Sequence, residues 1–182
     1  MGLWIILAVI ILIIIYAFIL YNNFISLDNK VEEAFSTMDV YLKKRWDLIP
    51  NLVETVKGYA KYEEETLTRV TELRNNTYNE MTNDEKIRNN EKLSSDVSKI
   101  MALKEAYPEL KANENFIDLS SKLTKIEDDI ANARKYYNGT VRIYNNKVQI
   151  FPNNIFAKLF GYKTKRMFEA NYEEKQNIKI NL

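Results

Sequence analysis

The 182-residue chain balances 26 Lys and Arg residues against 25 Asp and Glu residues, so its net field favours no polyanionic partner and argues against nucleic-acid binding. It contains no His and no Cys, which excludes Ser-His-Asp and Cys-His nucleophiles, thiol redox motifs and zinc sites built on either residue. Only 4 Gly and 3 Pro are present, and this scarcity of turn residues predicts an all-α protein.

The first element in chain order is an uncharged apolar run over residues 3–21. As a helix it would measure about 28 Å, close to the roughly 30 Å hydrocarbon core of a bilayer. A cleavable signal peptide needs basic residues before such a run and small residues after it, and residues 1–2 and 18–21 offer neither. We therefore expect residues 1–22 to be a retained transmembrane anchor, with a buried soluble helix as the weaker alternative.

The next apolar residues, from Phe24 to Leu48, recur every three or four positions, apart from a miss at Arg45. This is the heptad spacing of a helix seam in a coiled coil. No breaker separates it from the anchor, so one helix is predicted to run on to residue 49. Pro50 is predicted to stop or kink that helix and to begin a second one that ends near residues 75–77.

Two further helices are predicted beyond this point. Thr82 and Glu85 have the spacing of a capping box, which places a helix start at about Asp84, and Pro108 is expected to close that helix. The longest apolar seam then covers residues 113–151 and predicts one long helix up to Pro152. The first apolar residue of this seam is Phe116 and the last is Phe151.

Four long helices with short connections favour an antiparallel up-down-up-down four-helix bundle over residues 23–152, continuous with the single N-terminal transmembrane helix. The fourth helix exceeds the second by about eleven residues, or roughly 16 Å, so its end should reach the membrane surface. Residues 153–182 are then a membrane-proximal amphipathic segment and an extended tail, with strand-like alternation at residues 177–182.

The amphipathic segment is the candidate functional site, as a membrane-surface contact. Its apolar side chains would lie beside lipid headgroups and its cations near phosphates. The alternative is that the same residues cap the open end of the bundle core. The residues concerned are Ile155, Phe156, Leu159 and Phe160, with Lys158, Lys163, Lys165 and Arg166.

Acidic clusters at residues 63–65 and at Asp128 and Asp129 could suggest a cation site or an acid-base pair. Adjacent carboxylates on a helix point about 100° apart, however, so a solvated face is the better interpretation. A di-metal site inside a bundle would also usually recruit His. We therefore predict no catalytic, metal-binding or cofactor-binding residues.

Three separated motifs are similar to those of a known family. They are DLIPNLVETVKGYAKYE from Asp47, YPELKANENF from Tyr107 and FPNNIFAKLFGYKTKRMFEA from Phe151. Together they resemble the LemA family of bacterial membrane proteins. The resemblance implies a helical-bundle domain on one N-terminal span in the bacterial cell membrane, and it supplies no catalytic residues. Related members have been tied to envelope stress and to shaping membrane compartments, which implies an assembly role.

The expected function is a non-enzymatic, membrane-anchored scaffold that engages the lipid bilayer and unidentified membrane or envelope proteins, or further copies of itself. The alternative is a membrane-shaping element that acts through residues 155–166 and self-assembly, and a carboxylate- or tyrosine-based enzyme is a third. The distribution of Lys and Arg favours an outside N-terminus and a cytoplasmic bundle.

Overall fold

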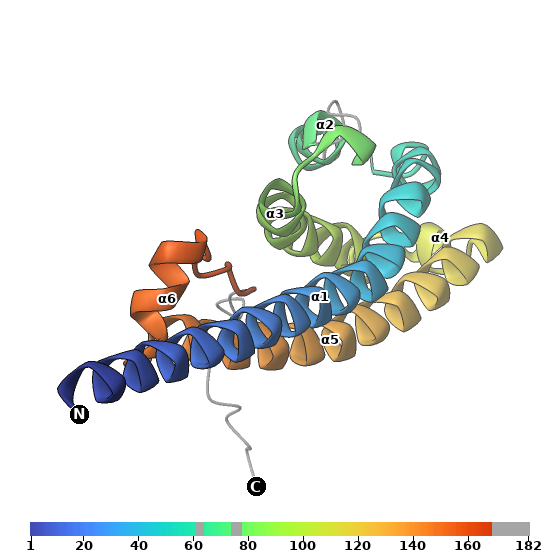
Figure 1. Cartoon of the computed structure of the whole chain (residues 1–182). Helices are drawn as coiled ribbons and strands as arrows, with labels where there is room; N and C mark the ends of the chain where they lie inside the picture. The colour runs from blue at the N-terminus through green and yellow to red at the C-terminus, as the bar shows by residue number, and fades with distance from the viewer. Residues whose placement is uncertain (61–63, 74–77, 169–182) are drawn as a thin grey trace, which may run out of the picture. The chain divides into compact units, whose positions relative to one another are not determined.

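The computed structural model describes residues 1–60, 64–73 and 78–168 (Figure 1). Every element in these ranges is a helix, which confirms the all-α prediction for the part of the chain that is described. The alternation predicted at residues 177–182 and the helix end predicted at 75–77 lie outside it. The elements are α1 (Gly2–Lys57), α2 (Glu64–Leu73), η1 (Tyr78–Glu80), α3 (Asn83–Ala102), η2 (Leu103–Glu105), α4 (Pro108–Lys111), α5 (Glu114–Gln149) and α6 (Asn153–Phe160).

The described residues divide into two compact units. The first unit comprises residues 1–37 and 135–167, and the second comprises the described residues between 38 and 134 together with Phe168. The two long helices, α1 and α5, each contribute a segment to both units.

The prediction that α1 stops at Pro50 is wrong: the helix continues through the proline to Lys57. A proline inside a helix removes a hydrogen bond and costs about 3 kcal/mol. Leu52 and Val56, which follow the proline, are fully buried, as is Ile49 before it. Burying two such side chains stabilises the fold by about 3–6 kcal/mol. The buried apolar face therefore outweighs the local penalty.

The helix predicted to start at Pro50 is consequently split. Residues 51–57 belong to α1, and α2 begins only at Glu64. Gly58 follows the last residue of α1, and the amides of Tyr59 and Ala60 both donate to the Val56 carbonyl oxygen at 2.9 Å. Glycine is a poor helix former. Gly58, rather than Pro50, therefore marks the end of the helix.

Helix α3 begins as its capping box predicts. The Glu85 amide donates to Thr82 Oγ1 at 3.3 Å, and the Thr82 amide donates to Glu85 Oε2 at 2.7 Å. The predicted end at Pro108 is wrong, because α3 stops at Ala102 and Pro108 starts the short helix α4. Proline suits a first helical position, since the amide there needs no partner inside the helix.

Helix α5 confirms the long fourth helix to within two residues at each end. Its seam is buried at Phe116, Leu123, Tyr137 and Tyr144, among others, whereas Phe151, the predicted last member, is 75% exposed. Phe151 follows the end of the helix, so its side chain no longer shares the buried face of α5.

Each unit has its own buried side chains. In the first unit they come from α1, α5 and α6. In the second they come from α1, α2, η1, α3, α4 and α5, together with Ala60 and Phe168. The larger core residues of the first unit are Leu20, Phe24, Val31, Phe35, Tyr137, Val141, Tyr144 and Val148; those of the second include Met38, Ile49, Leu52, Val70, Ile87, Ile100, Leu110, Phe116 and Leu123.

Candidate functional site

The N-terminal stretch of α1 is apolar and exposed. Among the described residues α1 is the one helix long and apolar enough to cross a membrane, with a mean hydropathy of 3.3 in its most apolar 18-residue window. Only 6% of that window is buried, and Trp4 and Phe18 are 75% and 66% exposed. Burial begins at Leu20 and Phe24. The exposed stretch thus ends where the uncharged run of the sequence ends, as in a candidate membrane span.

Helix α6 packs against the last turns of this stretch (Figure 1). Tyr16 Oη donates to Asn153 Oδ1 at 3.2 Å, and the Tyr16 ring meets Phe156 edge to face with centroids 5.8 Å apart. Tyr21 and Phe160 form a second edge-to-face pair at 5.2 Å. Such aromatic pairs add about 0.5–1.5 kcal/mol each to the burial of the rings. The segment after Pro152 is therefore a helix seated on α1.

The apolar residues of α6 divide between two faces. Asn153 and Ala157 are buried, and Phe156 is half-buried against α1. Ile155 and Leu159 are 57% and 75% exposed. At about 100° per residue, residues 155, 156, 159 and 160 lie within one arc of about 140°, with 155 and 159 toward one edge and 156 and 160 toward the other. The four apolar residues predicted to contact the membrane surface thus comprise an exposed pair, Ile155 and Leu159, and a half-buried pair, Phe156 and Phe160.

Helix α6 ends at Gly161, which adopts φ +80°. The Tyr162 amide donates to the Ala157 carbonyl oxygen at 2.9 Å, and the Gly161 amide donates to that of Lys158 at 3.3 Å. A side chain with a Cβ is strained in this left-handed conformation, which explains the glycine. Beyond the cap the chain continues as an irregular segment, residues 162–167, which we call the strap.

The strap is held along α5 by side chains of that helix. Tyr144 Oη donates to the Lys163 carbonyl oxygen at 2.9 Å, and Tyr137 Oη donates to that of Arg166 at 3.0 Å. The Asn145 amide group donates to the Lys165 carbonyl at 2.9 Å and accepts from the Lys165 amide at 2.8 Å. Because all four hydrogen bonds use the strap backbone, they fix its path whatever its side chains are.

Lys165, one of the predicted membrane-facing cations, pairs with two carboxylates of α1. Its Nζ lies 2.7 Å from both Asp28 Oδ1 and Glu32 Oε1 of α1, and 5.6 Å from the centre of the Tyr144 ring. Burial opposes its charge, but the hydrogen bonds to Asp28 and Glu32 and their negative charges outweigh burial, so the pKa of Lys165 is raised. For the neutral Tyr144 hydroxyl, in contrast, burial itself raises the pKa. Lys165 thus joins α1 to the strap, while Lys158 and Lys163 are exposed and Arg166 is half-buried.

The second unit contains a buried cation that sequence reasoning missed. Arg45 of α1 is fully buried. Its Nη1 donates to Glu127 Oε1 of α5 at 2.7 Å and to Ser94 Oγ of α3 at 2.6 Å. Its Nη2 donates to the Asn90 carbonyl oxygen at 3.1 Å and also to Asn90 Oδ1, whereas Nε, although buried, has no hydrogen-bond partner within the described residues.

The Arg45 cluster ties three helices together. We define it as Arg45, Asn90, Ser94 and Glu127. The sequence pointed to this cluster only through Arg45, a charged residue at a position where the heptad spacing predicts an apolar one. A buried guanidinium needs a carboxylate and several acceptors to offset its lost hydration. The apparent miss in the seam is therefore a buried polar contact, and not a solvent-facing residue.

A second polar contact joins α1, η1 and α3. Tyr78 Oη donates to Asp39 Oδ1 at 2.5 Å, and Lys86 Nζ lies 2.8 Å from Asp39 Oδ2 and 4.6 Å from the centre of the Tyr78 ring. Burial, with the bond to Asp39, raises the pKa of Tyr78 far above its ordinary range. Tyr78 therefore stays neutral and serves as a hydrogen-bond donor.

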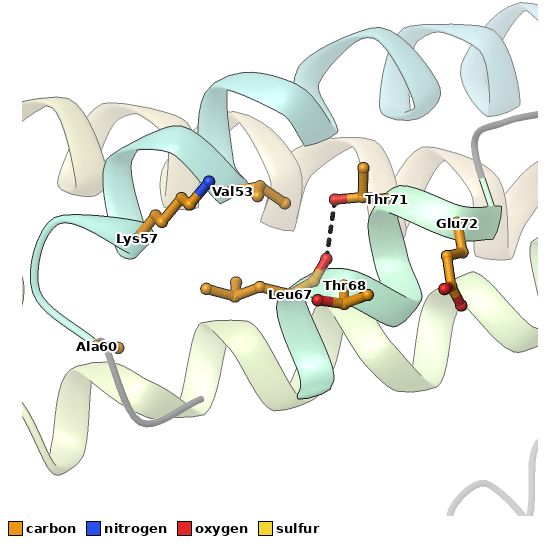
Figure 2. A pocket seen from close by; sticks show the side chains of 7 residues that line it. All are labelled: Val53, Lys57, Ala60, Leu67, Thr68, Thr71 and Glu72. Carbon is orange, nitrogen blue, oxygen red and sulfur yellow. Dashed lines mark hydrogen bonds between the residues drawn. The ribbon is translucent and has the colours of Figure 1, made fainter. Parts of the chain in front are cut away.

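A pocket of about 480 Å³ lies in the second unit between the end of α1 and α2 (Figure 2). Figure 2 shows Lys57 and Glu72 at opposite ends of its lining, with Val53 and Leu67 between them. The Thr71 hydroxyl donates to the Leu67 carbonyl within α2 at 2.8 Å and so is already engaged. The lining brings no acid-base pair together. Its complete set is Val53, Lys57, Ala60, Leu67, Thr68, Thr71 and Glu72.

The carboxylate clusters weighed as cation sites do not converge where they are described. Asp128 is exposed and Asp129 is half-buried on α5. Among residues 1–60, 64–73 and 78–168, no group of three or more His, Cys, Asp or Glu side chains is placed to hold a metal ion. The side chains at positions 63 and 64 lie outside the described part.

Comparison with known proteins covers both the site and the helical body. A model described as the LemA family matches residues 34–182. Protein LemA of Metamycoplasma hominis is 24% identical over 158 residues, which covers 86% of this chain and 72% of that protein. Magnetosome proteins MamQ 1 and MamQ 2 of Paramagnetospirillum magneticum are each 23% identical over 178 residues, which covers 82% of this chain. The chain spans 64% of the length of these two magnetosome proteins.

Proposed function

This chain belongs to the LemA family, and from that premise we propose that it is a non-enzymatic, membrane-anchored helical scaffold. Its first unit is seated at the bilayer, and its second unit binds other membrane or envelope proteins or further copies of the chain. The observation that carries the proposal is the packing of α6 onto the end of the exposed apolar stretch of α1. That packing connects the proposed membrane anchor directly to the folded first unit.

The depth of α6 supports this assignment. Tyr16, which contacts the start of α6, lies five residues before Tyr21, or about 7 Å along the helix axis. If residues 3–21 span the bilayer, Tyr21 lies at the boundary between acyl chains and headgroups, and the first turn of α6 lies about 7 Å inside it. Ile155 and Leu159, on the exposed side of α6, then meet lipid instead of water. Exposed aliphatic side chains at this depth are typical of interfacial helices.

The second unit is the proposed partner-binding body. We propose that α1, α2, α3 and α5 form an antiparallel four-helix bundle in it. The Arg45 cluster supports the proximity of α1, α3 and α5, and the ion pair between Arg69 and Asp96 at 3.4 Å supports that of α2 and α3. Val40 and Ile117, each 53% exposed, are apolar positions open to a partner.

Site-specific photo-crosslinking in native membranes tests the scaffold proposal. Because the chain has no Cys, single cysteines introduced by Val40→Cys or Ile117→Cys can be labelled with benzophenone maleimide without side reactions. Adducts larger than the monomer are expected from both positions, with protein partners or a second copy identified by mass spectrometry. Ile13→Cys, in the apolar stretch, is the control and should give lipid adducts. Monomer alone at positions 40 and 117 would refute the scaffold.

Membrane shaping is the second candidate function, and the exposure of Ile155 and Leu159 beside the apolar stretch favours it. Full-length protein reconstituted into liposomes should then narrow the vesicles as its density rises, as seen by electron cryomicroscopy. The Ile155→Ser, Leu159→Ser double variant should lose this effect and keep its melting temperature. Phe156→Ser should instead lower the melting temperature, because Phe156 packs on Tyr16. Unchanged vesicle diameters with the wild type would remove this candidate.

We also propose an outside N-terminus and cytoplasmic units. Lys and Arg residues near the end of a span favour the cytoplasmic side, and the residues that follow the apolar stretch in the first unit supply them. Added protease should spare the units in intact cells and digest them in lysates. Digestion in intact cells would reverse the assignment.

A further inference from the structure

The balanced net charge conceals a strongly basic segment. Residues 135–167, which comprise the last part of α5, α6 and the strap, contain seven Lys and Arg residues and no Asp or Glu. The rest of the first unit has three carboxylates, at Asp28, Glu32 and Glu33. Two of these, Asp28 and Glu32, pair with Lys165, and the seven cations of the segment outnumber the three carboxylates.

The register of α5 against α1 sets the height of each cation above the apolar stretch. The Phe35 ring meets the Tyr137 ring at 5.7 Å, and later residues of the chain return to Tyr16, so α5 and α1 run antiparallel within the first unit. Counting from this pair places Lys147 at about the level of α1 residue 25, only four residues beyond Tyr21. Lys147 thus lies roughly 6 Å from the level of Tyr21 along the α1 axis, whereas Arg142 lies about 13 Å from it.

Helix α6 brings two more cations to the same level. Phe156 lies beside Tyr16, Phe160 beside Tyr21, and the Tyr162 ring stacks on Phe24 at 4.9 Å. Lys158 therefore lies between the first two contacts, where its long stem can extend outward to headgroup level, and Lys163 follows the third contact. Both residues are exposed.

We propose that the first unit binds anionic lipid headgroups through Lys147, Lys158 and Lys163, which we call the basic band. This inference deepens the proposed membrane anchoring and rests on it. All three cations lie within about 8 Å of the level of Tyr21, one Debye length at physiological ionic strength. Each cation at such a surface strengthens the attraction to anionic lipid by about fivefold. Zwitterionic phosphatidylcholine, with no net charge, offers no matching field.

Spin-labelled lipids test this with the full-length chain. The protein is reconstituted in phosphatidylcholine, and the fraction of spin-labelled phosphatidylglycerol or phosphatidylcholine immobilised at its surface gives the relative affinity. The test variant combines Lys147→Gln, Lys158→Gln and Lys163→Gln. The matched control combines Lys92→Gln, Lys122→Gln and Lys125→Gln, three exposed lysines of the second unit that carry the same total charge.

The wild type and the control triple are expected to prefer phosphatidylglycerol by at least about fivefold, and the basic-band triple should approach equal affinity. Raising the salt from about 0.1 M to 1 M shortens the Debye length to about 3 Å and should abolish the wild-type preference, a readout that needs no variant. Equal affinity for both lipids in the wild type, or an equal loss in both triples, would overturn the basic band and leave the anchor intact.

Two other outcomes also decide the matter. If no lipid is immobilised at all, the membrane anchoring itself is wrong, and the basic band falls with it. If a single-stranded oligonucleotide displaces the immobilised phosphatidylglycerol at physiological salt, and the basic-band triple no longer binds that oligonucleotide, then the band serves nucleic acid and not lipid.

Discussion

Glu127→Gln should destabilise the protein more than Arg45→Met, although Arg45 is fully buried and the Glu127 side chain is 38% exposed. The glutamine leaves a guanidinium in the core with no carboxylate, and removing one partner of a buried ion pair costs about 3–5 kcal/mol. Because water reaches Glu127, we expect the lower end, about 3 kcal/mol. For a chain of this size that lowers the melting temperature by about 6–12 °C.

Arg45→Met removes the charge together with its need for a partner. It leaves the Asn90 acceptors unpaired, at a cost of about 1–2 kcal/mol. The Arg45→Met, Glu127→Gln double variant should therefore be more stable than Glu127→Gln alone.

The assay is thermal unfolding of the full-length chain in mild detergent, followed by circular dichroism at 222 nm as a helix signal. All four members of the cycle are compared under one condition. The reasoning fails if Glu127→Gln costs less than about 1 kcal/mol, or if the two single effects simply add in the double variant.

Four further predictions use the same unfolding assay. Gly139→Ala should stabilise the protein by about 0.5–1 kcal/mol, because the added Cβ meets no atom within 4 Å and alanine favours the helix α5. Gly161→Ala should instead destabilise it by about 1 kcal/mol, because alanine is strained at φ +80°. Equal effects of the two substitutions would contradict this. Thr82→Ala should cost about 1 kcal/mol by removing the α3 cap. Hydrogen bonds from Thr82 lower the pKa of Glu85 in the folded protein. Their stabilisation is therefore present above the pKa of Glu in the unfolded chain, near 4.3, and is lost as the pH falls below that pKa. Glu85→Gln should make the melting temperature depend less on pH in this acid range. The raised pKa of Lys165 gives stabilisation that is complete below about pH 10.4 and is lost as the pH rises through the pKa of Lys165 in the folded protein. Lys165→Gln should therefore make the melting temperature depend less on pH in the alkaline range.

Local signals predicted some helix boundaries well and others poorly. The capping box at Thr82 located the start of α3 because both of its hydrogen bonds form within four residues. Pro50 misled because its penalty is also local, whereas the burial of Leu52 and Val56 that outweighs it depends on residues far along the chain. A proline penalty can be read from sequence, but the packing that overrides it cannot.

The site shows the same division between local and distant causes. Helical periodicity located α6 but could not say which of its sides would meet α1, so Phe156 and Leu159 were grouped although they face differently. Lys165 was counted as a lipid-facing cation because its carboxylates, Asp28 and Glu32, lie far away in sequence. Whole-chain charge counting also hid the basic segment, since the compensating acidic residues lie mainly in the second unit.

The first unit joins residues 1–37 to residues 135–167, so its two halves leave the ribosome far apart in time. The apolar stretch of α1 is synthesised first, and α6, which packs against Tyr16 and Tyr21, comes only after about 130 further residues. Contacts of such long sequence separation form late in folding. During translation Phe24 of α1 therefore stays without its stacking contact until Tyr162 of the strap has been synthesised. A nascent chain arrested before Gly161 should be the form most open to capture by chaperones or by a neighbouring copy.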